Sequence, residues 1–203
     1  SKSFDAAARA GFSEAFKLHL ERILSLSLLL AMGAWIFREE LLIFLLGIEP
    51  TKERLLVVSF AAVSGLLIGA RSCGTDTVLQ LLKRSPALLI NAVIALCVGA
   101  FILVVSPGGS CLITLSLAML AAHATQLVLS AAQAQASGLL PAPRREFIFY
   151  VGGFVAISLL LGVPTLAEWN LSVPVVMAIK GIVLVVAFVP LLRLSFQRYT
   201  IER

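Results

Sequence analysis

The stretch Leu112–Gln135, LITLSLAMLAAHATQLVLSAAQAQ, decides the fold class of this chain. It contains no charged residue and is long enough to cross a bilayer as an α-helix, which takes about 20 residues. At about 100° per residue, five of its polar side chains fall within roughly one third of the helix circumference: Ser116, His123, Gln126, Ser130 and Gln133. Amide and imidazole groups are not expected to face lipid. This polar row therefore predicts a helix side that faces other protein or a water-filled cavity.

The polar row has two interpretations. Its members either hydrogen-bond neighbouring helices and hold a bundle together, or they line a path for a substrate. His123, near the middle of the stretch, is accordingly either an interhelical hydrogen-bonding group or a carrier of protons. The row indicates how the helix is oriented and identifies no ligand.

The composition of the chain indicates an integral membrane protein. Of 203 residues, 60% are hydrophobic and 13% are charged, against about 25% charged residues in soluble domains. Between Arg84 and Arg144 there is no Asp, Glu, Lys or Arg at all. A soluble domain of this length cannot bury so much apolar surface, so we expect an all-α integral membrane protein.

Hydropathy and loop signals divide residues 1–203 into one lobe of six transmembrane helices. The predicted spans are about 18–37, 55–70, 87–105, 112–135, 147–161 and 173–192. An amphipathic lead-in, Ser1–Arg22, precedes them and is either an interfacial or a solvated helix. The apolar piece Leu41–Ile48 is too short to cross, and is either a dip into the interface or an extension of the first helix. Polar residues predict a loop over Arg71–Ser85.

The basic residues predict the orientation of these spans. Twelve of the 16 fall on one side: Lys2, Arg9, Lys17, Arg22, Arg71, Lys83, Arg84, Arg144, Arg145, Arg193, Arg198 and Arg203. The opposite side has only Arg38, Lys52 and Arg54, which stand among four glutamates. By the positive-inside rule, both termini are predicted to be cytoplasmic. The net charge of +5 therefore follows the membrane topology, and no nucleic-acid partner is expected.

Two further features lie inside the spans. Lys180 interrupts the sixth span, where a lysine is costly unless it snorkels to the outer interface, pairs with a carboxylate or lines a cavity that attracts an anion. Ala61, Gly65 and Gly69 recur every four residues in the second span, a spacing that allows close helix approach.

No catalytic motif is present in the sequence. There is no P-loop, HExxH, GxSxG or paired-carboxylate spacing, so an enzyme is not expected. The three cysteines, Cys73, Cys97 and Cys111, are scattered and indicate neither a metal site nor a disulfide framework, and no cofactor is expected. Asp76 is expected to cap a helix or to pair with Lys83.

The order of these elements resembles a known family. An amphipathic lead-in (FDAAARAGFSEAFKLHLERILSLSLLLA) precedes a span and a short apolar piece (ELLIFLLGI), and a polar loop and an uncharged hairpin (VVSPGGS) follow later. This order resembles the C-terminal six-helix half of polysaccharide and lipid-linked oligosaccharide flippases of the multidrug/oligosaccharidyl-lipid/polysaccharide exporter superfamily. The resemblance lies in hydropathy and loop pattern over nearly the whole chain.

The resemblance implies a lobe that moves a lipid-linked sugar outward by alternating access. It implies that the first two spans line a central cavity, that Arg22 meets the pyrophosphate, and that the protein is a multi-pass protein of the inner (cell) membrane. Such exporters have twelve or fourteen spans. The chain, which begins at Ser1 without Met, is therefore expected to need a second six-helix lobe, from the same polypeptide or from another copy.

We therefore predict a transport lobe for an anionic lipid-linked saccharide. Its candidate path residues are Arg22, Lys180 and the polar row. Two alternatives remain: a membrane-embedded interaction or scaffold subunit, and a small six-span transporter that acts as a dimer.

Overall fold

The structure is a computed structural model, and it describes residues 2–106, 110–138, 143–162 and 172–196, with side chains from Glu14 onward. Every element in these ranges is helical. Six helices are long and apolar enough to cross a membrane: Glu14–Ile36, Lys52–Leu81, Ser85–Val105, Cys111–Ala136, Arg145–Gly162 and Val173–Phe196. The prediction of an all-α chain with six helices of membrane-spanning length is thus confirmed. The predicted hairpin at 106–110 and the side chains at the start of the lead-in fall mostly outside the described residues.

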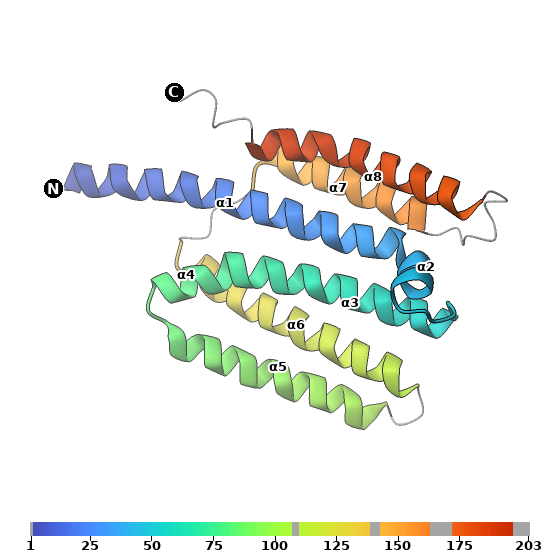
Figure 1. The fold of residues 1–203 in the computed structure, drawn as a ribbon. Coiled ribbons are helices and arrows are strands. Elements are labelled where there is room, and N and C mark those ends of the chain that lie inside the picture. Colours follow the sequence, from blue (N-terminus) through green and yellow to red (C-terminus); the bar gives the residue numbers. More distant parts are fainter. Residues whose placement is uncertain (1, 107–109, 139–142, 163–171, 197–203) are drawn as a thin grey trace.

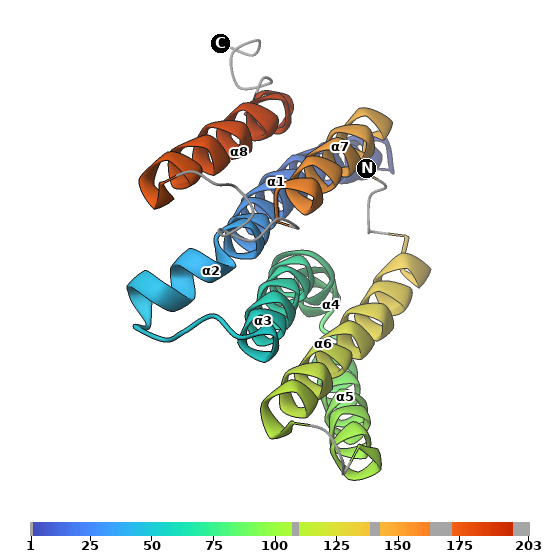
Figure 2. The ribbon, with the colours of Figure 1, turned by 90° about the vertical axis from the view of Figure 1, so that its right-hand side faces the viewer.

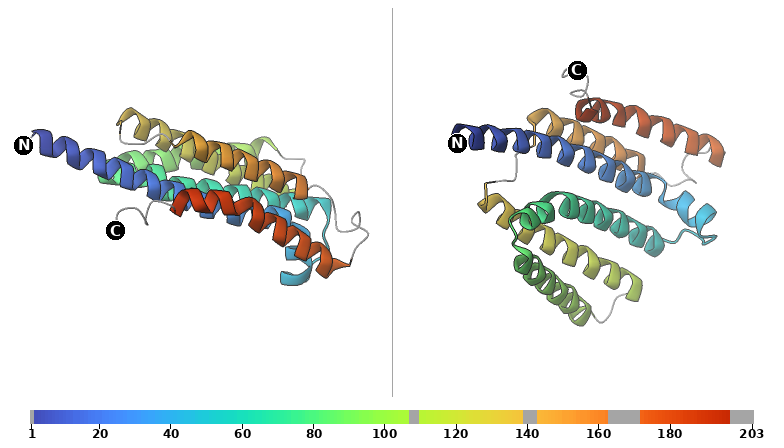
Figure 3. Two further views of the ribbon diagram at one scale, coloured as in Figure 1. Left: turned by 90° about the horizontal axis from the view of Figure 1, so that it is seen from above. Right: turned by 60° about the vertical axis from the view of Figure 1, so that its left-hand side comes forward.

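The helices form two groups that meet along α1 (Lys2–Ile36) and α3 (Lys52–Ala70). On one side, α7 (Arg145–Gly162) and α8 (Val173–Phe196) pack against α1, and we call these three the first unit. On the other side, α6 (Cys111–Ala136) packs against α3, and α5 (Ser85–Val105) packs against α6. We call α3 with its continuation to Leu81, α5 and α6 the second unit. Figures 1 and 2 show this order from α8 to α5. The start of α1 and the end of α8 lie at the same end of the bundle, and α1 projects beyond the other helices there (Figure 3).

The main apolar core lies inside the first unit. Ile36 of α1, Phe154 of α7 and Leu191 of α8 are almost fully buried, and the rings of Phe154 and Phe188 lie 5.6 Å apart. Most large apolar side chains on the outer faces of the bundle are exposed, for example Leu96 and Phe149. This is the pattern expected of helices whose outer surface meets lipid.

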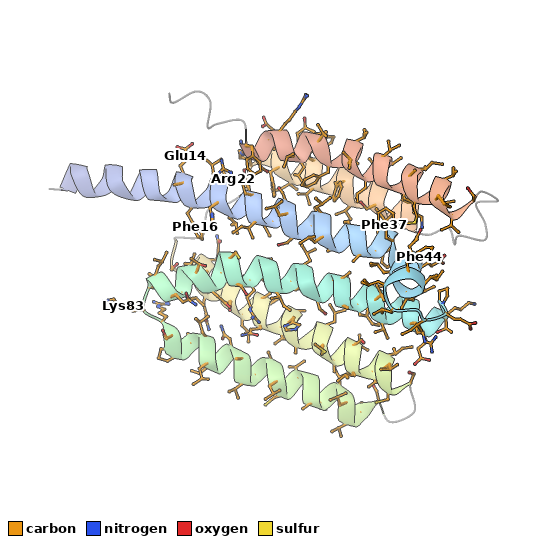
Figure 4. The ribbon with its side chains drawn as sticks, in the orientation of Figure 1. Glu14, Phe16, Arg22, Phe37, Phe44 and Lys83 are labelled. Carbon is orange, nitrogen blue, oxygen red and sulfur yellow. The ribbon has the colours of Figure 1, made fainter. Side chains whose placement is uncertain are left out.

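The piece after the first span is helical. It consists of α2 (Arg38–Glu40) and a π-helical turn, η1 (Leu41–Leu45), so Leu41–Ile48 begins as an extension of the first helix. Leu42 is buried, whereas Phe44 is exposed at the end of the bundle opposite the start of α1, as Figure 4 shows. The extension places Glu39 and Glu40 inside the protein.

The predicted loop at Arg71–Ser85 is wrong over most of its length. The helix that begins with α3 continues through a π-helical turn, η2 (Arg71–Thr75), into α4 (Asp76–Leu81). Only a short turn then separates it from α5, with Lys83 at a φ of 56°. Of the polar side chains that suggested a loop, Arg71 instead finds a partner in the neighbouring helix α6 and Asp76 pairs with Arg71, as described below.

The small residues of α3 differ in how closely α1 approaches them. A Cβ placed on Gly69 would lie 3.0 Å from Ser27 Cβ and closer still to Ser27 Oγ, so α1 passes very near this position. A Cβ on Gly65 would meet nothing within 4 Å. Ala61 and Gly65 instead line an open groove between the two helices. The two helices thus come closest near Gly69 and separate toward Ala61.

Candidate functional site: a charged cluster inside the second unit

Arg71 lies within the membrane-spanning part of the bundle. Its Nη1 donates a hydrogen bond to Gln126 Oε1 of α6. Gln126 is fifteen residues from the first residue of α6 and ten from the last, which is about 22 Å and about 15 Å along the helix axis. A hydrocarbon core is about 30 Å thick. The guanidinium therefore lies deep in the bundle and not in a loop at its edge.

Arg71 is paired with Asp76, and the π turn makes this pairing possible. Arg71 Nε lies 3.0 Å from Asp76 Oδ2, and the two side chains are 16% and 13% exposed. Residues five positions apart point about 140° away from each other on an α-helix. In η2 the Asp76 backbone N–H instead bonds to the Arg71 carbonyl, an i+5 bond that brings the two residues to one side. Such π turns recur at functional sites.

Three buried polar atoms in this neighbourhood lack hydrogen-bond partners. Within the described part of the chain these are Arg71 Nε, Asp76 Oδ1 and His123 Nδ1, and Arg71 Nε lies within ion-pair distance of Asp76 Oδ2. His123 precedes Gln126 by one helical turn, so both lie on the same side of α6. Buried polar groups are normally satisfied. We refer to Arg71, Asp76, His123 and Gln126 as the Arg71 cluster.

The rest of the predicted polar row turns to other partners. Ser130 and Gln133 bond to Asn91 of α5, which is 1% exposed, with Asn91 Nδ2 at 3.3 Å from Ser130 Oγ and 3.0 Å from Gln133 Oε1. Gln133 Nε2 returns a 3.0 Å bond to Asn91 Oδ1. Ser116 Oγ donates to the carbonyl of Leu112 in its own helix. The row is therefore not one continuous path: one end bonds to α5, the other bonds within α6, and its centre belongs to the Arg71 cluster.

Lys180 is buried and paired inside the first unit. Its Nζ donates to Glu40 Oε1 at 2.8 Å and to the Ile36 carbonyl at 3.1 Å, and the two side chains are 2% and 3% exposed. Its ammonium is therefore not directed to the aqueous surface. Nearby, Arg38 donates to the Gly162 carbonyl at 2.9 Å and lies over the Trp35 ring.

Arg22 belongs to the opposite end of the first unit (Figure 4). Its Nε donates to the Ser195 carbonyl at 3.0 Å, and its guanidinium lies over the Phe196 ring. The adjacent Glu21 accepts a 2.9 Å bond from Arg144 Nε, and its side chain is 1% exposed. Buried charges thus tie α1 to α7 and α8 at both ends of the first unit.

Two hollows lie along α1. A cleft of about 190 Å³ between α1, η2 and α6 includes Lys17, Glu21, Thr75 and Leu127 in its lining. A groove of about 210 Å³ has a lining drawn entirely from α1 and α3, mostly of small or apolar residues such as Ser27, Ala31, Ala34, Ala61 and Gly65. The two units therefore meet along α1 and α3 with hollows beside the close approach at Gly69, while each unit is held together internally by polar contacts.

Arg71 and Asp76 were not among the residues that the sequence singled out as a path. A usable signal was present: no proline interrupts residues 55–76, so the apolar helix had no reason to end at Ala70. A helix continued by one further turn places a charge inside the membrane.

The three cysteines, Cys73, Cys97 and Cys111, are free thiols in the structure.

No protein-family model, curated protein or solved structure matches this chain.

Proposed function

We propose that this chain is one lobe of a membrane transporter that moves a lipid-linked saccharide with an anionic phosphate linkage. The observation that carries the proposal is the Arg71 cluster, an ion pair with unsatisfied polar atoms deep among membrane-spanning helices. Ionisable residues at such depth are rare and mark substrate or ion pathways. A guanidinium also suits a phosphate group because its donors match phosphate oxygens in pairs.

The groove between α1 and α3 supports the same function. Its lining comes from the first two spans, the pair that the resemblance implies as the cavity wall. Its apolar, small-residue character suits a lipid chain. Two units with a cleft and a groove between them also suit transport by relative motion of helix bundles.

A flipping assay tests the proposal. The full chain is reconstituted in liposomes with a polyprenyl-pyrophosphate-linked oligosaccharide that carries a fluorophore on the sugar, and a membrane-impermeant quencher reports which leaflet holds the label. We expect faster exchange with the parent chain than with Arg71→Gln or with protein-free liposomes. Arg193→Gln, which removes an exposed arginine of α8, is the matched control and should behave as the parent. Equal rates for the parent and Arg71→Gln would refute the proposal.

A scaffold subunit is the second candidate. The observation that favours it is that Ser130, Gln133 and Lys180 are all engaged in contacts between helices. This alternative predicts that Arg71→Gln lowers stability or assembly with a partner and that the parent chain causes no flipping.

A further inference from the structure

In the Arg71 cluster, the Asp76 carboxylate and an incoming anion would compete for the same Arg71 guanidinium. Asp76 Oδ2 lies 3.0 Å from Arg71 Nε in an ion pair without an aligned hydrogen bond, and the side chain of Arg71 is 16% exposed. An incoming phosphate that pairs with the guanidinium must take over the place of Asp76. This exchange leaves the Asp76 carboxylate buried and without its cation.

A buried carboxylate without a counter-charge is strongly unfavourable, and such a group takes up a proton. Asp76 Oδ1 is the atom available for it, because this oxygen is already buried and has no hydrogen-bond partner within the described residues. After the exchange, Asp76 is neutral and Arg71 balances one negative charge of the bound phosphate group.

Few other titratable groups around the site could accept this proton. The turn η2 is packed against α1, α3, α4 and α6. The titratable side chains that these elements contribute are Cys73, Asp76, His123 of α6, and Lys17 and Glu21 of α1. Glu21 is already paired with Arg144. Among these groups, His123 also has a buried ring nitrogen, Nδ1, without a hydrogen-bond partner in the described structure.

We infer that the Arg71 cluster is a coupled binding site in which one phosphate anion binds Arg71 as one proton binds Asp76. The inference rests on the proposed function for the identity of the anion, a polyprenyl pyrophosphate. The exchange itself requires only a phosphate group and a proton. Because one proton accompanies the anion, lower pH favours binding, by at most about tenfold per pH unit.

The test uses the full chain in nanodiscs of phosphatidylcholine and farnesyl pyrophosphate as the probe. Affinity is measured across pH, and proton uptake is measured calorimetrically in two buffers of different ionisation enthalpy. We expect uptake near one proton for each probe bound. Asp76→Asn should still bind the probe but take up about one proton fewer, a difference that also cancels protons bound by the probe itself. Arg71→Gln should lose binding, whereas Glu49→Gln, at an exposed glutamate, should match the parent.

The outcomes separate this inference from the proposed function. Arg71-dependent binding with the same proton uptake in the parent and in Asp76→Asn overturns the inference and leaves the proposed function standing. Inorganic pyrophosphate that binds with proton uptake, while farnesyl pyrophosphate does not bind, supports the exchange and counts against a lipid-linked substrate. Failure of both probes contradicts both proposals.

A second measurement covers the case in which Asp76→Asn does not fold. Infrared difference spectra of the parent chain, recorded on addition of the probe, should show the carbonyl band of a newly protonated carboxyl group. Its absence in a sample that binds the probe overturns the inference.

Discussion

The Lys180–Glu40 pair allows a direct test of whether these two charges are buried and paired in the first unit. Lys180→Met leaves a buried carboxylate, and Glu40→Gln leaves a buried ammonium, because the two side chains are 2% and 3% exposed. Each substitution preserves most of the side-chain volume, so packing changes little. The double variant removes both charges at once.

The expected magnitudes follow from this burial. Removing one partner of a buried ion pair costs about 3–5 kcal/mol, so the two single variants together should lose about 6–10 kcal/mol of the free energy of unfolding. Replacing the whole pair by uncharged groups of similar size is often close to neutral. We therefore expect the double variant to be less destabilised than the sum of the singles by at least about 3 kcal/mol.

Reversible unfolding in mixed micelles of a mild detergent and dodecyl sulfate measures these free energies. Arg193→Met, at an exposed position of the same helix, is the control and should change stability by less than about 0.5 kcal/mol. Additive single effects, or single effects below about 1 kcal/mol, would refute the buried pair. Lys180 would then reach the aqueous interface instead.

Two further predictions concern helix packing and use the same unfolding assay. Gly69→Ala should destabilise the chain by about 1–3 kcal/mol because its Cβ would meet Ser27, whereas Gly65→Ala should be nearly neutral; equal effects would contradict the close approach at Gly69. Asn91→Leu should cost about 1–2 kcal/mol because it removes the α5–α6 hydrogen bonds and leaves Gln133 unpaired, and an unchanged stability would show that these bonds are not formed.

The existence of the six long helices could be predicted because each one is a continuous run of mostly apolar residues in the sequence. A run of apolar residues has to be helical in a membrane whatever its neighbours are. Boundaries depended on more than hydropathy. The second span continues past Ala70 because Arg71 finds Asp76 and Gln126, and the sequence shows polar residues there without showing their partners.

The candidate site could be predicted only in part for the same reason. His123 and Gln126 were found because a polar row on one helix face can be read from spacing alone. Arg71 was missed because Gln126 lies 55 residues away and because its pairing with Asp76 depends on a π turn that residue spacing does not show. Lys180 left several interpretations open, since the carboxylate that meets it, Glu40, is 140 residues earlier in the chain.

These long separations have a consequence for biosynthesis. Glu21 and Glu40 belong to the first helix and its extension, but their basic partners come 123 and 140 residues later. At about 5–20 residues per second, α1 waits roughly 6–30 s for Arg144 and Lys180 to be synthesised. During that interval both carboxylates stay near water, lie in the insertion machinery or are neutral. The second unit, whose contacts among α3, α5 and α6 are complete earlier, can assemble first, with α1 locked in place only when α7 and α8 arrive.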